Sequence, residues 1–260
     1  MHRVSVNVAD IWANPEFNCE RVTQALFNEK IEVLERSDEY SRVRLSDGYE
    51  GFLSNKFYAE VGDSGDGDVI VSAIIAMAHI SADPRAPVAT ILPFTSRLNK
   101  IKTVDGFAVC ETPKYGYVYV PEDDLIAGGN APTLKHETIP LFIESVKRFL
   151  GVPYLWGGKS FFGMDCSGLI QTNLKFFNFE FPRDTKDQIK RGREVSRTEI
   201  RPGDLLFFER HVALAISDKS FIHSSLSQGG VHINSLDSQK QNYLKFLDDG
   251  LKAVRRIIED

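Results

Sequence analysis

The chain has 260 residues, of which 42% are hydrophobic and 26% charged, and this length favours two or three domains with well-buried cores. Its 31 basic and 36 acidic residues give a formal net charge of -5, and no run rich in Lys and Arg occurs, which argues against a nucleic-acid partner. The three cysteines lie far apart without a CxxC pair, and their odd number favours reduced thiols over a disulfide framework.

The beginning of the chain, MHRVSVNVAD, alternates apolar and polar residues like a strand and lacks the basic and long apolar segments of a signal peptide. The longest apolar stretch, Val69–Ala78, is about half of the roughly 20 residues that a bilayer span needs. We therefore expect a cytoplasmic protein without a transmembrane segment. If a signal peptide had been removed from a longer precursor, the protein would instead act outside the membrane.

Two polar, glycine-rich stretches, Val61–Asp68 and Ala127–Thr133, interrupt the apolar pattern and are predicted to be linkers. The segment between them resembles the first sixty residues, weakly but in the same order. Both segments consist of short apolar stretches of near period two, separated by Gly, Pro and Asp turns, which is typical of small β-barrels. We predict one small β-barrel at residues 1–62 and a second at residues 63–130, followed by a third domain at residues 131–260.

The third domain begins with helical patterns and ends with strand patterns. Apolar residues at helical spacing over Ile139–Leu150, with Pro140 in the first turn and Gly151 after the end, predict an amphipathic helix. A second helix is expected over about Cys166–Phe177, with Asp165 or its neighbour as its cap. The strand-like runs that follow are DLLFFER, HVALAIS, SFIHSS, GVHINS and AVRRII. Helices followed by an antiparallel sheet predict an α+β domain.

Cys166 is the candidate nucleophile of this domain. A free thiol has a pKa of about 8.5, and a helix N-terminus or a nearby histidine favours its thiolate. His211 opens the strand HVALAIS, and period-two alternation places Ala213 and Ala215 on its face, where they leave room for a helix. His223 in the next strand could then pair with His211 and orient its ring, as the third group of a triad does.

Each of these residues also has a simpler interpretation. A lone cysteine is most often an inert buried hydrophobe, although the DCSG setting of Cys166 argues against that here. Cys166, His211 and His223 could instead bind zinc, since the ligand types fit, but no close-spaced pair such as CxxC or HxxxH exists. The remaining histidines are expected to be structural: His2, His79, His136 and His232.

The run GVPYLWGGKSFFGMDCSGLIQ resembles the signature of the NlpC/P60 cysteine peptidases, and FPRDTKDQ, RPGDLLFF, HVALAIS and FIHSS follow it in that family's order. The resemblance covers roughly residues 141–258. It implies a papain-like α+β domain in which Cys166 is the nucleophile, His211 the base and His223 the third catalytic residue, without a metal or another cofactor. Tyr154 corresponds to the family's tyrosine near the nucleophile, which is suspected of helping the oxyanion site. A core aromatic residue with a hydrogen-bonded hydroxyl is the alternative for Tyr154.

Two positions depart from the family's pattern. Ala213 stands where the family commonly has glycine after the His-Val pair, and FFERH replaces a looser turn of small residues. Neither change removes a catalytic group. Arg183, Asp184 and Thr185 match the family's loop after the nucleophile helix, either as substrate contacts or as an ion pair that fixes the loop.

Tandem SH3-like modules before such a domain, with ERVTQALFNE and DGYEGF in the first, resemble the γ-D-glutamyl-L-diamino acid endopeptidases that trim cell-wall peptides. This implies a murein peptide substrate with a free N-terminal L-Ala-γ-D-Glu unit, followed by diaminopimelate or lysine. It also implies substrate contacts from Glu20 and Tyr49 in the first module and from Asp165, Ser167 and Trp156 in the catalytic domain. The simpler alternative is that Glu20 is a solvated charge and Tyr49 a barrel aromatic.

Other functions remain open at the level of sequence. A relative with the same fold could be an N-acetylmuramoyl amidase or an acyltransferase. A wall-binding protein with an inactive catalytic domain is the non-enzymatic alternative, and the complete Cys/His/His set argues against it.

Overall fold

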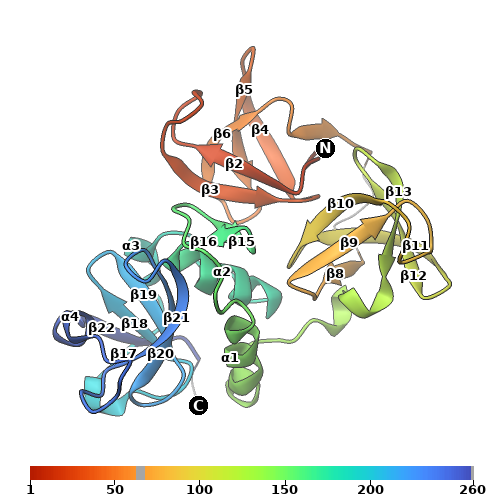
Figure 1. Cartoon of the computed structure of the whole chain (residues 1–260). Coiled ribbons are helices and arrows are strands. Elements are labelled where there is room, and N and C mark those ends of the chain that lie inside the picture. Colours follow the sequence, from red (N-terminus) through yellow and green to blue (C-terminus); the bar gives the residue numbers. More distant parts are fainter. Residues whose placement is uncertain (63–67, 259–260) are drawn as a thin grey trace. The chain divides into compact units, whose positions relative to one another are not determined.

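A computed structural model describes residues 1–62 and 68–258 of the chain (Figure 1). The chain divides into two compact units, Met1–Ala131 and Pro132–Asp260. The predicted linker Val61–Asp68 falls largely on residues outside the described ones. Strands predominate in the chain as a whole, so a description as helices against a sheet applies to the second unit alone. No helix in the described residues is both long enough and apolar enough to cross a membrane.

The first unit contains two seven-stranded antiparallel sheets whose strands are arranged in the same way. The orders are β3-β2-β6-β5-β4-β1-β7 and β10-β9-β13-β12-β11-β8-β14. Each strand of the second sheet is thus the seventh strand along the chain after its counterpart in the first sheet. The weak repeat in the sequence therefore corresponds to a repeated topology. The strands are β1 (His2–Val4), β2 (Val8–Trp12), β3 (Arg21–Leu26), β4 (Lys30–Arg36), β5 (Tyr40–Leu45), β6 (Glu50–Ser54), β7 (Tyr58–Glu60), β8 (Val69–Val71), β9 (Ile75–His79), β10 (Val88–Pro93), β11 (Arg97–Val104), β12 (Phe107–Thr112), β13 (Gly116–Pro121) and β14 (Leu125–Ala127).

Contacts between the two sheets explain why they form one unit. Each sheet encloses its own cluster of buried apolar side chains, but Phe27, which directly follows β3, lies in the cluster of the second sheet. Its ring stacks on Tyr115 with the ring centroids 6.5 Å apart. The neighbouring Asn28 donates a hydrogen bond of 2.7 Å from its Nδ2 to the carbonyl oxygen of Arg97. Because the ring of Phe27 is buried against the second sheet, the stabilities of the two sheets are coupled.

The second unit packs helices against a six-stranded antiparallel sheet of order β17-β22-β18-β19-β20-β21. Helices α1 and α2 contact each other through the edge-to-face pair Phe142 and Phe177 and through a buried hydrogen bond of 2.7 Å from Ser145 Oγ to Asn173 Oδ1. The elements are α1 (Ile139–Lys147), β15 (Lys159–Ser160), β16 (Gly163–Met164), α2 (Cys166–Phe176), α3 (Thr185–Gln188), β17 (Arg193–Val195), β18 (Leu205–Phe208), β19 (His211–Ala215), β20 (Ser220–Ser225), β21 (Gly230–Ser235), α4 (Lys245–Asp249) and β22 (Ala253–Arg256).

The first helix is shorter than its apolar pattern predicts. It was expected to extend to Leu150 but ends at Lys147, because the N–H groups of Phe149 and Leu150 bond three residues back instead of four. Gly151 follows with φ 82°, the left-handed conformation expected after a helix end. The short hairpin of β15 and β16, the strand β17 and the short helices α3 and α4 were not anticipated from the sequence.

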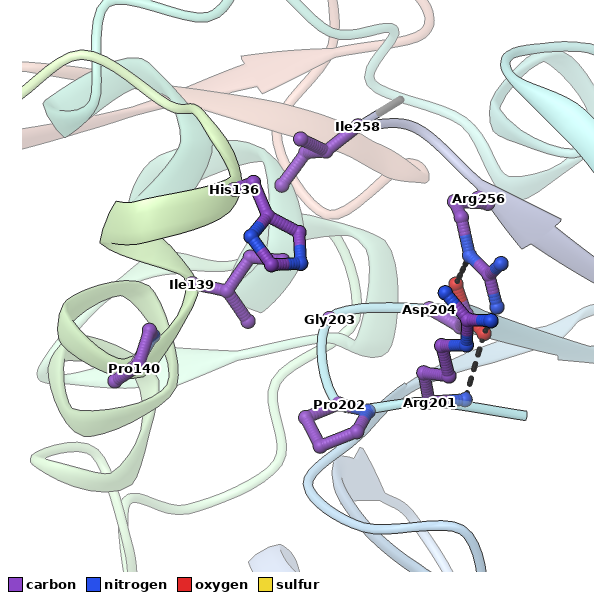
Figure 2. A pocket seen from close by; sticks show the side chains of 9 residues that line it. All are labelled: His136, Ile139, Pro140, Arg201, Pro202, Gly203, Asp204, Arg256 and Ile258. Carbon is purple, nitrogen blue, oxygen red and sulfur yellow. Dashed lines mark hydrogen bonds and ion pairs between the residues drawn. The ribbon is translucent and has the colours of Figure 1, made fainter. Parts of the chain in front are cut away.

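A pocket of about 270 Å³ lies in this unit, beside a buried ion pair that ties two strands together (Figure 2). Arg256 at the end of β22 donates from Nε and Nη2 to the two oxygens of Asp204, each at 2.8 Å. The N–H of Arg201 donates to the same carboxylate at 2.8 Å. These bonds hold the turn before β18 against β22, and so they help to position β18 and the next strand, β19.

Candidate active site

The nucleophile candidate, Cys166, is the first residue of α2, as the sequence predicts. Asp165 precedes it in an extended conformation, and its side chain accepts a hydrogen bond of 2.6 Å from the N–H of Gly168. This is the ordinary N-cap arrangement, and it explains where the helix begins. A Cβ atom at Gly168 would lie 2.2 Å from the carbonyl oxygen of Gly158, so only glycine fits at this position of the CSG sequence.

Asp165 is held in a buried network. Its Oδ2 accepts hydrogen bonds from the N–H of Gly157 at 2.9 Å and from Arg183 Nη2 at 2.6 Å. Its Oδ1 accepts from Arg183 Nη1 at 3.0 Å and from Ser167 Oγ at 3.2 Å, besides Gly168. Five donors thus occupy a carboxylate that offers about four lone-pair sites. The network uses the acceptor capacity with which Asp165 would otherwise bind a substrate.

The ion pair explains the charge state of Arg183. Burial disfavours the charged guanidinium, but the Asp165 carboxylate outweighs this effect and raises the pKa of Arg183 above its usual value. Arg183 also donates to Ser167 Oγ at 2.8 Å. Of the two roles left open for this loop, the structure shows the ion pair that fixes it.

The neighbouring loop residues lie nearer the surface. Thr185 Oγ1 is 3.9 Å from Cys166 Sγ. Asp184 forms a 3.5 Å ion pair with the exposed Lys186. Trp156 is 48% exposed, and the guanidinium carbon of Arg210 lies 6.0 Å from its ring centroid. Thr185 thus contacts the sulfur of Cys166 directly.

The two histidines form a direct pair. His211, the first residue of β19, and His223 in β20 are joined by a 2.8 Å hydrogen bond between His211 Nε2 and His223 Nδ1. His223 continues the chain of bonds, because its Nε2 lies 2.9 Å from Asn234 Oδ1. Asn234 Nδ2 in turn donates to the carbonyl oxygen of Asn242 at 3.0 Å.

This chain of bonds determines where the protons lie. Because the amide nitrogen of Asn234 is directed to a carbonyl oxygen, its own oxygen faces His223, and Nε2 of a neutral His223 must carry the hydrogen. His223 Nδ1 is then an acceptor for the Nε2–H of His211. His211 Nδ1 therefore keeps its lone pair and can accept a proton, which is what a general base requires.

Asn234 was missed in the sequence, although a signal for it exists. Strands β20 and β21 pair with Phe221 opposite Asn234 and His223 opposite His232. Alternate residues of a strand share a face, so Phe221 and His223 lie on the same face as Asn234. A search of GVHINS for a polar residue diagonal to His223 would have found it.

The sulfur meets β19 at the residue after the histidine. Helix α2 packs against β19 and β20, and the N–H of Val212 forms a hydrogen bond to Cys166 that lowers its thiol pKa. Ala213 and Ala215 lie in a cluster of buried side chains that includes Leu247 of α4. The short helix α4 thus occupies room left by these small residues.

Burial keeps both reacting groups neutral. It raises the pKa of the Cys166 thiol to about 11, with the nearby Asp165 charge as a second cause. It lowers the pKa of His211 to about 3 and that of His223 to about 4, with His223 as a further cause for His211. Burial thus favours the thiol and the imidazole over the thiolate and the imidazolium, against the effect of the helix N-terminus.

Tyr154 lies in the same electrostatic environment as the sulfur. Burial raises its pKa to about 12, and the Cys166 and Asp165 charges act in the same direction. Its N–H donates to the carbonyl oxygen of Gly229 at 3.1 Å, which fixes the backbone. The hydroxyl therefore stays protonated at neutral pH and remains a hydrogen-bond donor.

The two residues predicted from the SH3 side lie in the first unit. Glu20 is exposed and directly precedes β3, and Tyr49 is half-buried and directly precedes β6. The N–H of Tyr49 donates to Asp47 Oδ1 at 3.0 Å. Their role in substrate binding remains a prediction.

The zinc alternative finds no ligand set in the part of the chain that the structure describes. Across residues 1–62 and 68–258, no group of three or more His, Cys, Asp or Glu side chains is arranged to hold a metal ion. The histidine pair is instead joined by a direct hydrogen bond.

Comparisons with known proteins agree with the motifs. Residues 151–247 match the NlpC/P60 family, and residues 11–56 match the bacterial dipeptidyl-peptidase SH3 domain. The chain is similar to the gamma-D-glutamyl-L-lysine dipeptidyl-peptidase of Bacillus subtilis, with 29% identity over 263 residues that cover 92% of this chain and 81% of the relative. The protein of the same name from Bacillus cereus is 28% identical over 244 residues, which cover 83% and 71% of the two chains.

The fold has a counterpart among solved structures. A crystal structure of an NlpC/P60 family protein from Bacillus cereus aligns with a TM-score of 0.84 and 22% identity over 99% of each chain. The resemblance predicted from the sequence is confirmed for the NlpC/P60 domain and for a bacterial SH3 domain ahead of it.

Proposed function

We propose that this chain, which carries an NlpC/P60 cysteine-peptidase domain behind a bacterial SH3 domain, hydrolyses the γ-D-glutamyl-L-diamino acid bond of cell-wall peptides. The observation that carries the proposal is the chain of hydrogen bonds from Asn234 through His223 to His211, with Cys166 packed against the same strand. The bond itself is suggested by the two relatives named as gamma-D-glutamyl-L-lysine dipeptidyl-peptidases.

The first half of the reaction uses the neutral pair. As the sulfur of Cys166 attacks the γ-glutamyl carbonyl carbon, its proton passes to His211 Nδ1, and the carbonyl oxygen gains negative charge. The N–H of Cys166, the first residue of α2, has no partner within the helix and can stabilise this oxygen, together with the protonated Tyr154 hydroxyl. His211 then gives the proton to the leaving amine, and the C–N bond breaks.

The second half releases the acyl-enzyme. Water attacks the thioester carbonyl carbon while His211 accepts one of its protons; the C–S bond then breaks, and His211 returns this proton to the sulfur, which leaves as a thiol. Throughout, His223 and Asn234 keep the Nε2–H of His211 occupied, so that Nδ1 is the nitrogen that exchanges protons. Without this arrangement both tautomers of His211 would be populated.

The proposed substrate carries a free N-terminal L-Ala. Such an amine is absent from peptides still joined to lactyl groups of the wall, so this preference suits recycled fragments inside the cytoplasm. Glu20 and Tyr49 are proposed as substrate contacts of the first unit. In the second unit, the side chains of Asp165 and Ser167 already bond to Arg183, and they are proposed to support the substrate-binding residues of that unit.

The test is product analysis by mass spectrometry. L-Ala-γ-D-Glu-diaminopimelate should give L-Ala-D-Glu and free diaminopimelate, and Cys166→Ala should give no product. Cleavage of an intact muropeptide at the lactyl-alanine bond would indicate an amidase instead. Transfer of the acyl group to an added amine rather than to water would indicate an acyltransferase. No turnover of any of these substrates by the wild-type protein would support the non-enzymatic alternative.

A further inference from the structure

An arginine occupies the turn directly before the histidine base. Phe208 pairs with His211 in the β18–β19 ladder, so Glu209 and Arg210 form a two-residue turn. Arg210 adopts φ 53°, a left-handed conformation that disfavours every side chain relative to glycine. The turn therefore carries a long cationic side chain at a position whose backbone conformation favours glycine.

The guanidinium of Arg210 is placed on an aromatic surface without a counterion. Its Cζ lies 6.0 Å from the ring centroid of Trp156, within the range of a cation–π contact. Neighbouring Glu209 is already paired with Lys252. Over the described residues, Arg210 forms no ion pair with a carboxylate. Arg210 is exposed and Trp156 is about half exposed, so the cation remains accessible to a ligand.

Arg210 shares the electrostatic environment of the reacting groups. Its charge lowers the pKa of the Tyr154 hydroxyl, while the Cys166 charge raises it. Tyr154 is therefore within range of both residues. The peptide bond from Arg210 to His211 also ties the cation to the group that protonates the leaving amine in the proposed reaction.

The position of the base indicates which part of a substrate reaches Arg210. His211 must contact the nitrogen of the leaving diamino acid, so that amino acid lies on the side of His211. Its α-carboxylate is bonded to the carbon that carries this nitrogen. Diaminopimelate has a second carboxylate at the far end of its side chain, where lysine has only an ammonium group.

We propose that Arg210, supported by Trp156, is a subsite for a carboxylate of the leaving diamino acid. The proposal rests on the proposed function and specifies the chemistry on the leaving side of the bond. A guanidinium binds a carboxylate through two parallel hydrogen bonds, and the indole surface restricts its orientation. If the side-chain carboxylate is bound, the enzyme prefers diaminopimelate over lysine; if the α-carboxylate is bound, it accepts both but requires a free C-terminus.

The test uses four tripeptides, L-Ala-γ-D-Glu followed by diaminopimelate or lysine, each with a free or an amidated α-carboxylate. Arg210→Gly is the informative variant, because glycine suits φ 53° and the turn should fold at least as well. We expect kcat/KM to fall about 10-fold, mainly through KM, as for the loss of a partly exposed charged hydrogen bond. Arg210→Lys should restore part of the activity. Arg193→Gln, an exposed charge on the edge strand β17, is the control and should change nothing.

The pattern across the peptides decides the result. A loss on both free peptides that disappears on both amides identifies the α-carboxylate. A loss on the two diaminopimelate peptides alone identifies the side-chain carboxylate. An equal loss on all four peptides, or none, would overturn the subsite while wild-type turnover still supported the proposed function. Failure of the wild-type protein to cleave any of the four would refute the proposed function itself.

Discussion

Asp165→Asn should strongly destabilise the second unit. The substitution keeps the size of the side chain and an oxygen that can cap α2 at Gly168, but it removes the charge opposite Arg183. The side chains of Arg183 and Asp165 are only 2% and 9% exposed, so the guanidinium would remain buried without its counterion. Breaking a buried pair in this way costs about 3–5 kcal/mol, a large fraction of the roughly 5–15 kcal/mol by which domains are stable.

Urea unfolding can isolate the second unit. The chain has two tryptophans, Trp12 in the first unit and Trp156 in the second, so a Trp12→Phe background leaves Trp156 as the only tryptophan, which can be excited selectively over tyrosine. The free energy of unfolding should fall by about 3–5 kcal/mol for Asp165→Asn. The double variant with Arg183→Met should lose less than the sum of the two single losses, because neither charge is then left alone.

A different outcome would return Asp165 to the substrate. If Asp165→Asn cost less than about 1 kcal/mol and combined additively with Arg183→Met, the ion pair would contribute little to stability. If KM then rose for peptides with a free amine but not for N-acetylated ones, Asp165 would hold the substrate's ammonium, in keeping with the substrate contact that the family resemblance implies. The network described here would in that case rearrange on binding.

Three further predictions concern Asn234, the pH dependence of the activity and the pH dependence of the stability. Asn234→Leu should lower kcat at least about 10-fold with little change in KM, because Asn234 acts only by positioning His223. Asn234→Gln should recover part of the activity. An unchanged kcat in Asn234→Leu would exclude a positioning role for Asn234. The kcat/KM of the wild type should be flat between about pH 5 and pH 7, below the titration of the substrate's α-amine, since the pKa of His211 is about 3 and that of Cys166 about 11; an acid limb near pH 6.5 would contradict this. Between about pH 6.5 and pH 4, His223 is protonated in the unfolded chain but stays neutral in the folded chain, where its pKa is about 4. As the pH falls through this range, the free energy of unfolding measured in urea should therefore fall, with His223 contributing up to about 1.4 kcal/mol per pH unit.

Local patterns in the sequence predicted the two longer helices of the second unit, most of its strands and the candidate reacting groups. The start of α2 at Cys166 follows from Asp165 as an N-cap, and the strands carrying His211 and His223 follow from their period-two runs. These features depend on residues a few positions apart, so they can be read without the fold. The repeated strand order of the first unit was likewise visible as a repeat, although its second copy matched the first only weakly.

The tertiary structure alone decided what surrounds those groups. Asp165 is an ion-pair partner because the fold brings Arg183 and the N–H of Gly157 to its oxygens, and Asn234 fixes the proton of His223 because two strands pair in one particular register. The neutral state of Cys166 follows from burial, which sums the effects of side chains from several distant segments. Such quantities depend on which residues exclude water from a group, and no local pattern in the chain contains that information.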